Sequence, residues 1–272
     1  MKEVKRIVDT TLRDGEQQAG IALSPEEKLE LALLLDAIGV YEIEAGIPCL
    51  GAEEMSYLKA TMRRKKQAQV SVWTRANVAD IQYATCCMPD IIHIGTPISY
   101  VQIYTKLKKN KIWIQNNLLD CIKVAHDKGI EVTVGFEDAS RADMGYIIST
   151  AKLVRRLGVK IIRIADTVGV LTPSRTKSII EELMNQVDID IEIHVHNDLG
   201  MAVANSIEGL KAGAKYVDCT LGGIGERAGN CNFYDLVYAA ERYFDFGVKK
   251  GHIRKLEQKL EQILNRSQLA TN

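Results

Sequence analysis

The strongest chemical signal in the sequence is a pair of histidines separated by one residue. His194 and His196 close a β-branched run that begins at Ile191 and is typical of a buried strand. Side chains alternate along a strand, so both imidazoles point to the same side. This arrangement suits a divalent metal better than an apolar core. An isolated His-x-His, however, is more often an ordinary pair of core or surface histidines.

A carboxylate near the N-terminus completes a set of possible metal ligands. Asp14 follows the first predicted strand and, with His194 and His196, gives one carboxylate and two imidazoles. This set leaves positions open for water or for the two oxygens of a 2-oxo acid. The neighbouring Arg13 would then neutralise an oxyanion, and Thr167 would donate a hydrogen bond to a carboxylate. Mg²⁺, Mn²⁺ and Zn²⁺ all fit such a mixed site.

Polar residues also end most of the other predicted strands. In a parallel α/β barrel the catalytic groups gather at the carboxyl ends of the strands, so these residues are candidates for substrate binding or catalysis. Burying so many charges without pairing or a metal would cost several kcal/mol per ion. For two of them, Glu44 and Arg75, an ion pair at the rim is an equally good interpretation. The candidates are Glu44, Arg75, His93, Glu137 and Thr167.

A glycine-rich turn follows the last predicted strand. Backbone N–H groups in such a turn can bind phosphate, which makes it a candidate contact for a phosphate-bearing cofactor. Gly-x-Gly spacing is also common in purely structural loops, so this alternative stays open. The candidate residues are Gly223, Gly225, Glu226 and Arg227.

The elements that would position these groups alternate regularly between strand and helix. Eight such units in about 250 residues predict a (β/α)8 TIM barrel. A doubly wound sheet is the runner-up, but its early Gly-x-Gly-x-x-Gly turn is absent. The predicted strands are Val4–Asp9, Val40–Ala45, Val70–Thr74, Ile91–Gly95, Ile130–Gly135, Ile161–Ala165, Ile191–His196 and Tyr216–Thr220.

Local signals predict where helices begin and end. Ser24, followed by proline and two glutamates, predicts a helix start, and Thr172 before a proline repeats this pattern. Gly39 follows an apolar helical stretch and predicts its end. We therefore expect a barrel over residues 1–250 and a short amphipathic C-terminal helical segment over 251–272.

The composition excludes several functional classes. The 272 residues carry 35 basic and 35 acidic side chains, and 46% are hydrophobic, which argues against nucleic-acid binding and against disorder. No leader-like or membrane-spanning apolar stretch is evident, so no membrane association is expected. The six cysteines form no Cys-x-x-Cys pair, which favours a reducing, cytoplasmic location.

Three motifs resemble the family of α-isopropylmalate synthase, homocitrate synthase and hydroxymethylglutaryl-CoA lyase. They are the segments 9–17, 194–200 and 223–230, and the resemblance covers about residues 1–245. It implies that Asp14, His194 and His196 bind the metal, with Asn230 at or near its coordination shell. By the same resemblance Arg13 stabilises the keto or enolate oxygen and Thr167 holds the α-carboxylate. Glu137, Glu44 and Gln17 would orient these groups, and His93 would line the pocket for the substrate's side chain.

Within that family the chain looks most like the condensing enzymes. The lyases carry a cysteine in the glycine-rich turn that is absent here, whereas the segments 42–48 and 135–143 look like homocitrate synthase of the nitrogen-fixation type. The resemblance implies condensation of acetyl-CoA with a 2-oxo acid, and 2-oxoglutarate is the favoured acceptor. The alternatives are 2-isopropylmalate or citramalate synthase, an aldolase-type lyase, and a protein that binds a 2-oxo acid without turnover.

Two departures from the family bear on this expectation. Homocitrate synthases of the lysine pathway use an arginine on the fifth strand for the distal carboxylate of 2-oxoglutarate, where this sequence has Thr133. Family synthases also continue into C-terminal subdomains that assist proton transfer. We therefore expect either a homodimer or a hetero-oligomer with a chain that supplies this region.

Overall fold

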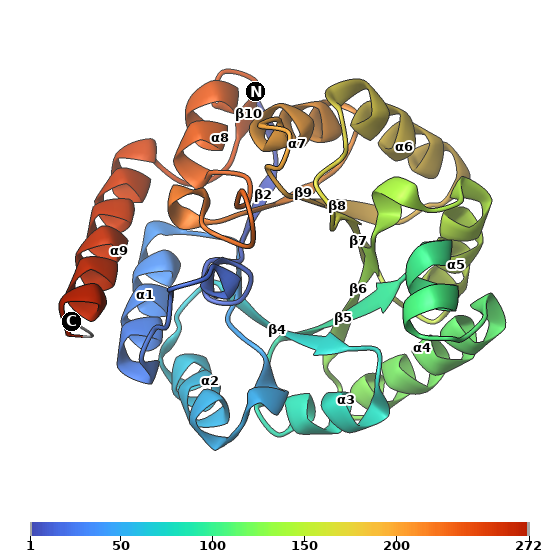
Figure 1. The fold of residues 1–272 in the computed structure, drawn as a ribbon, viewed down its shortest axis with the longest axis horizontal. Coiled ribbons are helices and arrows are strands. Elements are labelled where there is room, and N and C mark those ends of the chain that lie inside the picture. The colour runs from blue at the N-terminus through green and yellow to red at the C-terminus, as the bar shows by residue number, and fades with distance from the viewer. Residues whose placement is uncertain (1, 271–272) are drawn as a thin grey trace.

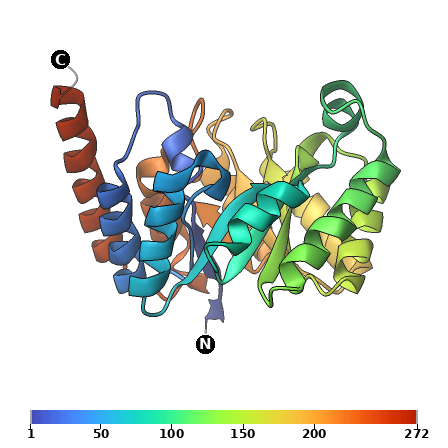
Figure 2. The same cartoon turned by 90° about the horizontal axis from the view of Figure 1, so that it is seen from below.

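Residues 2–270 of the computed structural model form a closed barrel of eight parallel strands inside a ring of helices (Figure 1). Each predicted strand is present within one or two residues of its expected ends, which confirms the TIM barrel. The side view shows the chain entering at the lower end, so the carboxyl ends of the strands face upward (Figure 2). The strands are β2 (Arg6–Asp9), β3 (Glu42–Glu44), β4 (Gln69–Arg75), β5 (Ile91–Pro97), β6 (Glu131–Glu137), β7 (Ile161–Asp166), β8 (Asp190–Val195) and β9 (Tyr216–Cys219).

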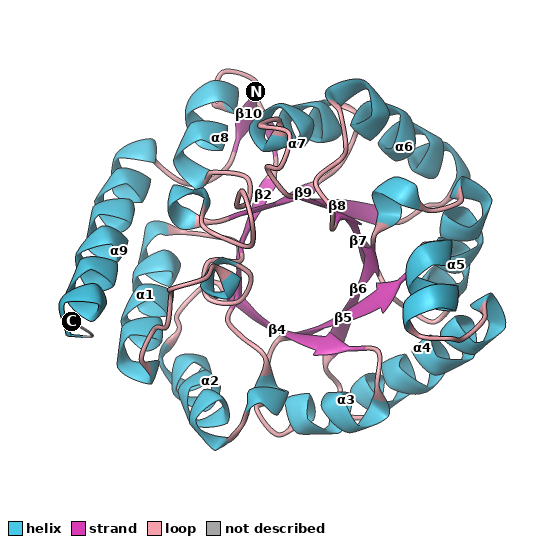
Figure 3. Ribbon diagram, viewed as in Figure 1, coloured by secondary structure: helices cyan, strands magenta, loops and turns pink. Residues whose placement is uncertain are grey.

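Helices cover the outer face of the barrel and alternate with the strands along the chain (Figure 3). Short helical turns lie in several loops between a strand and the next helix. The helices are α1 (Pro25–Ile38), α2 (Ala52–Arg64), α3 (Val78–Thr85), α4 (Lys111–His126), α5 (Met144–Arg156), α6 (Pro173–Gln186), α7 (Ala202–Lys211), α8 (Phe233–Ala240) and α9 (Lys250–Ala270), and the turns are η1 (Gly15–Gln17), η2 (Pro48–Leu50), η3 (Val101–Lys106), η4 (Ala139–Arg141) and η5 (Leu221–Gly223).

The predicted helix boundaries are confirmed by their hydrogen bonds. Ser24 accepts from the backbone N–H of Glu27, whose side chain accepts in return from the N–H of Ser24. Thr172 caps α6 through the N–H of Arg175. Gly39 ends α1 at φ +90°, a conformation that side chains with a Cβ rarely adopt.

The N- and C-terminal segments close the outer layer. Strand β1 (Glu3–Val4) pairs with β10 (Phe244–Asp245), apart from the barrel. Helix α9 packs against α1 and α8 through an apolar stripe that includes Ile253, Leu256 and Leu260. The division at residues 250 and 251 stays a prediction, and the last two residues of the predicted segment, 271–272, lie outside the described residues.

No described helix is long and apolar enough to cross a membrane. All six cysteines are free thiols.

Candidate metal centre and active site

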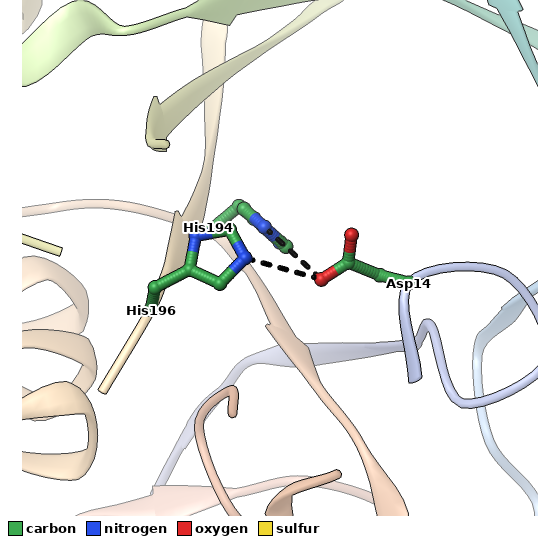
Figure 4. A group of neighbouring side chains, drawn as sticks. All are labelled: Asp14, His194 and His196. Carbon is green, nitrogen blue, oxygen red and sulfur yellow. Dashed lines mark ion pairs between the residues drawn. The ribbon is translucent and has the colours of Figure 1, made fainter. Parts of the chain in front are cut away.

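Asp14, His194 and His196 meet at the carboxyl end of the barrel (Figure 4). Asp14 lies in the loop after β2, while His194 is in β8 and His196 follows the end of that strand. Their ligand atoms lie within 4.8 Å of one another, and all three side chains are buried. Asp14 Oδ2 is 3.4 Å from His196 Nε2 and 3.7 Å from His194 Nε2. The sequence motifs, although far apart in the chain, therefore form one cluster.

The Nδ1 atoms of both histidines have fixed hydrogen-bond partners. His194 Nδ1 is 3.0 Å from Asp218 Oδ2, and His196 Nδ1 donates to the backbone oxygen of Asp166 at 3.1 Å. Each ring thus keeps its proton on Nδ1 and directs an Nε2 lone pair toward Asp14, as metal-ligating histidines do. Burial lowers the pKa of His194 to about 4, so this imidazole is neutral at neutral pH. His196 Nε2 has no hydrogen-bond partner within the described chain.

Asn230 supplies a fourth possible metal ligand at this site. Its amide nitrogen donates to Asp14 Oδ2 at 2.7 Å and to the backbone oxygen of Ile224 at 3.1 Å. Its Oδ1 is buried and has no partner among the described residues. Burial alone would raise the pKa of Asp14, but the positive charge of Arg13 holds it well below its usual value, so Asp14 is anionic. Two imidazole lone pairs, a carboxylate and an unpartnered amide oxygen fit a divalent cation.

Arg13 lies directly beside this cluster. Its Nη1 is 2.6 Å from Asp14 Oδ1, and its Nε pairs with Glu44. The guanidinium also lies over the ring of Trp73, with Cζ 5.8 Å from the centroid. Burial opposes its charge, but Glu44 and Asp14 outweigh burial and raise the pKa of Arg13. A permanent positive charge therefore adjoins the candidate metal site.

Glu137 and Thr167 lie together at the ends of β6 and β7. The Thr167 hydroxyl donates to Glu137 Oε2 at 3.1 Å and accepts from the backbone N–H of Asp138 at 2.8 Å. These contacts fix the orientation of the hydroxyl at the mouth of the barrel.

His93 and Gln17 take two different positions around the mouth. His93 is fully buried, with Nδ1 2.8 Å from the hydroxyl of Thr133, and its Nε2 has no partner in the described part of the chain. The absence of a side chain at Gly135 makes room for this ring, because a Cβ there would collide with His93 Nε2. Gln17 ends η1 and lines, with Arg13, an open cavity of about 610 Å³.

The glycine-rich turn folds back on itself beside Asn230. The backbone N–H of Asn230 donates to the Gly223 oxygen at 3.0 Å, and Gly223 adopts φ +70°. The N–H of Gly225 donates to Gln18 Oε1 at 3.2 Å. Arg227 forms two hydrogen bonds with Asp198, at 2.8 and 3.0 Å, and also pairs with Glu226. These contacts position Asn230, and the expected binding of a cofactor by this turn stays a prediction.

The alternative pairing of Glu44 with Arg75 is wrong. Arg75 instead binds Asp80 of α3 through two hydrogen bonds, at 2.6 and 3.0 Å, and 65% of its side chain is exposed. Glu44 is fully buried and pairs with Arg13 and Arg163. The two side chains separate because Glu44 points into the barrel and Arg75 reaches outward from the end of β4. The structure therefore does not bring Arg75 into the cluster.

Sequence reasoning missed a layer of charged residues just below the site. Arg163, Glu192 and Asp218 are all buried inside the barrel, and Arg163 contacts both acids. A signal was available, because Arg163 and Glu192 each lie between isoleucines in a predicted strand, and a charged residue can share a side of the strand with a candidate ligand. Glu192, for example, is two residues before His194.

Comparison with known proteins supports the family expected from the motifs. The chain is 44% identical over 257 residues to homocitrate synthase subunit alpha of Clostridium pasteurianum, covering 94% of this chain and 96% of that protein. It is 41% identical to homocitrate synthase 1 of Nostoc, covering 93% of this chain and 67% of the relative. It is 39% identical to 2-isopropylmalate synthase 2 of Caldanaerobacter subterraneus, covering 93% of this chain and 66% of the relative.

Solved structures share the fold at much lower identity. The HMG-CoA lyase of Bacillus subtilis superposes with a TM-score of 0.87 at 18% identity and covers 99% of both chains. The sequence profile described as HMGL-like matches residues 5–264. The chain, with its closed barrel and the cluster of Asp14, His194 and His196, therefore belongs to the HMGL-like family.

Proposed function

We propose that this chain is the catalytic barrel of an acyltransferase that condenses acetyl-CoA with a 2-oxo acid, with 2-oxoglutarate as the favoured acceptor and homocitrate as the product. The observation that carries the proposal is the cluster of Asp14, His194, His196 and Asn230 with Arg13 beside it. The synthase names of the relatives support condensation over cleavage.

A divalent cation would be held by four ligand residues, which are Asp14, His194, His196 and Asn230. When bound, Mg²⁺, Mn²⁺ or Zn²⁺ would polarise the ketone carbonyl of the acceptor and make its carbon electrophilic. The fixed Nδ1 hydrogen bonds of the two histidines would keep their Nε2 atoms available to the cation.

Arg13 and Thr167 would bind the acceptor from two sides. The Arg13 guanidinium carries a fixed positive charge where negative charge develops on the former ketone oxygen, and stabilisation of this kind often contributes more to the rate of acyl transfer than any other effect. The Thr167 hydroxyl would turn from Glu137 to donate to the α-carboxylate, while Glu137 and Gln17 orient these groups. Glu44 would hold the Arg13 side chain in place by pairing with Arg13 Nε.

The remaining part of the acceptor would face His93, whose Nε2 is buried and unpartnered in the described structure. Such an atom favours a ligand that offers it a hydrogen bond, because an unmet buried polar group costs about 1–3 kcal/mol. The distal carboxylate of 2-oxoglutarate would provide this partner. Arg75, exposed and paired with Asp80, takes no part in this arrangement.

Acetyl-CoA would approach over the glycine-rich turn of Gly223, Gly225, Glu226 and Arg227, as the sequence predicts. Arg227, a partly exposed cation of this turn that pairs with Asp198, supports a phosphate contact. A base would remove a proton from the acetyl group, and the resulting enolate carbon would bond to the ketone carbon while the electron pair of the carbonyl moves to its oxygen, which then takes up a proton. Water would then hydrolyse the thioester and release the carboxylate product and the free thiol of CoA.

A second chain would complete the activity. The relative from Clostridium pasteurianum is called a subunit alpha, and this chain covers 96% of it, which supports a hetero-oligomer over a homodimer. A cytoplasmic location agrees with the six free thiols.

The decisive experiment is thiol release from acetyl-CoA by the metal-loaded protein with 2-oxoglutarate, 2-oxoisovalerate, pyruvate and oxaloacetate in parallel. Activity with 2-oxoglutarate alone supports the proposal, and activity with another acid corrects the acceptor. Activity that appears only when extract from the source cells is added supports the second chain. Full turnover by the purified chain alone would contradict that part, and cleavage of hydroxyacyl-CoA without condensation would favour a lyase.

A further inference from the structure

We propose that Arg163 is a positioning residue that holds Arg13 and His194 in their working orientations. The inference rests on the proposed function, in which Arg13 stabilises the oxyanion and His194 binds the metal. Arg163 lies in β7 inside the barrel, where barrels of this fold usually carry branched aliphatic side chains. It is among the largest fully buried side chains of the protein.

Arg163 is linked to Arg13 through Glu44. Arg163 Nη2 is 2.7 Å from Glu44 Oε2, and the other oxygen of the same carboxylate accepts from Arg13 Nε. Arg13 Nη1 in turn is 2.6 Å from Asp14 Oδ1. Glu44 is therefore held at both oxygens between two arginines, and its orientation sets the position of the Arg13 guanidinium.

Arg163 is also linked to His194, through Asp218. Arg163 Nε, which donates to Glu192, is also 3.0 Å from Asp218 Oδ2, and the same oxygen is 3.0 Å from His194 Nδ1. His194 Nε2 faces Asp14 Oδ2 at 3.7 Å, which closes a ring. We call the six members of this ring the ion-pair ring, which the neutral imidazole of His194 joins through its polar contacts with Asp218 and Asp14; the members are Arg163, Glu44, Arg13, Asp14, His194 and Asp218.

The chemistry of the arginine side chain explains why this ring needs it. A guanidinium is planar and presents donors in several fixed directions, so one side chain can contact Glu44 and Asp218 at once. A lysine carries the same charge as a single compact ammonium and cannot reproduce both contacts. Every member of the ring is at most 8% exposed, so solvent does not replace a lost partner.

A purely structural role is the competing explanation, because removing one member of a buried ionic cluster also destabilises a protein. Two measurements separate the roles without relying on turnover. The absorption spectrum of the Co²⁺-loaded protein reports ligand geometry, and calorimetric titration with Mn²⁺ or Zn²⁺ reports metal affinity.

The main test is Arg163→Lys, with Ile161→Ala as the matched control. Ile161 lies two residues away on the same strand, so its truncation destabilises β7 without removing a member of the ion-pair ring. We expect Arg163→Lys to weaken metal binding by about 10- to 100-fold, the usual loss when a partner of a metal ligand is removed. The Co²⁺ spectrum should change and kcat should fall, while Ile161→Ala leaves spectrum and affinity unchanged. An unaltered spectrum and affinity in Arg163→Lys would overturn the proposal.

A second test covers the case in which Arg163→Lys does not fold. Glu44→Gln interrupts the branch to Arg13, and Asp218→Asn interrupts the branch to His194. If Arg163 couples the branches, the double variant loses metal affinity by a factor that differs from the product of the single losses. Independent losses would overturn the proposal. Because these readouts need no acetyl-CoA, they remain informative even if the condensation assay fails.

Discussion

At the amino end of the barrel, Val8, Ile161 and Tyr216 pack together against Tyr41, whereas the carboxyl end gathers the ionisable groups of the candidate site. The same eight strands build both ends. The charged pairs at the amino end, such as Lys160 with Glu131, are exposed and satisfy each other. Exposed pairs of this kind contribute little to stability, so apolar packing holds this end together.

The carboxyl end differs because several buried polar atoms without partners lie at the candidate site. His196 Nε2, Asn230 Oδ1 and His93 Nε2 are buried and make no hydrogen bond within the described residues. Leaving such groups unsatisfied costs stability, and a bound ligand would recover that cost. One end of the barrel is therefore arranged for stability and the other for binding, and the ion-pair ring includes Asp14 and His194 of the binding end.

The largest effect is expected from His196→Ala. The variant removes an imidazole that faces Asp14 at 3.4 Å, so stoichiometric metal and activity should be lost together. His126→Ala at the end of α4 is the matched control, because it removes an exposed imidazole that borders a second cavity, at the amino end of the barrel. Metal analysis by mass spectrometry checks both. One equivalent of metal retained by His196→Ala would remove this residue from the site.

Arg13→Gln should separate metal binding from catalysis. The side chain touches Asp14 and Glu44 but offers no metal ligand, so metal content should persist while kcat falls by about 100- to 1,000-fold, the scale of losing one oxyanion donor. Lys160→Gln, which removes an exposed cation at the amino end, should leave kcat unchanged. Equal rates for Arg13→Gln and the parent protein would exclude Arg13 from the mechanism.

Ile161→Ala should lower the stability of the protein and leave its metal affinity unchanged. Truncating this side chain in the amino-end apolar cluster should lower the free energy of unfolding by about 2 kcal/mol, since Ile-to-Ala changes in cores cost at least this much. Denaturant titration measures the loss, and metal affinity should not change. A loss of metal affinity as large as that of Arg163→Lys would mean that the two ends are not independent.

The smallest effect concerns Glu42, whose two oxygens are buried without hydrogen-bond partners within the described chain. Burial, and then the nearby Glu192, raise its pKa to about 8, against about 4.3 in an unfolded chain. The folded protein therefore binds more protons between these values, and the free energy of unfolding falls as pH rises through this window.

Glu42→Gln should flatten this dependence by up to about 1.4 kcal/mol between pH 6 and pH 7. Glu131→Gln, an exposed acid at the amino end, is the control that keeps the parental slope. Denaturant titrations at both pH values measure the difference. Identical slopes for Glu42→Gln and the parent would show that Glu42 is charged in the folded state.

Much of the candidate site was predictable because its residues lie in short, local patterns. The motif around His194 and His196 predicts two imidazoles on one side of a strand, and the alternation of β-branched runs with capped helices predicts the barrel. The barrel in turn requires Asp14 to lie at the same end as both histidines. The family expected from these motifs is confirmed by the match over residues 5–264.

The partners of the charged side chains were decided by the tertiary structure alone. The sequence places Glu44 and Arg75 at neighbouring strand ends, but only the inward direction of Glu44 brings it between Arg13 and Arg163. Likewise, only folding places Asp218 against His194. Sequence determines which side chains a strand presents, because alternation is local. Which of these side chains meet depends on barrel closure, which joins strands that are far apart in the chain.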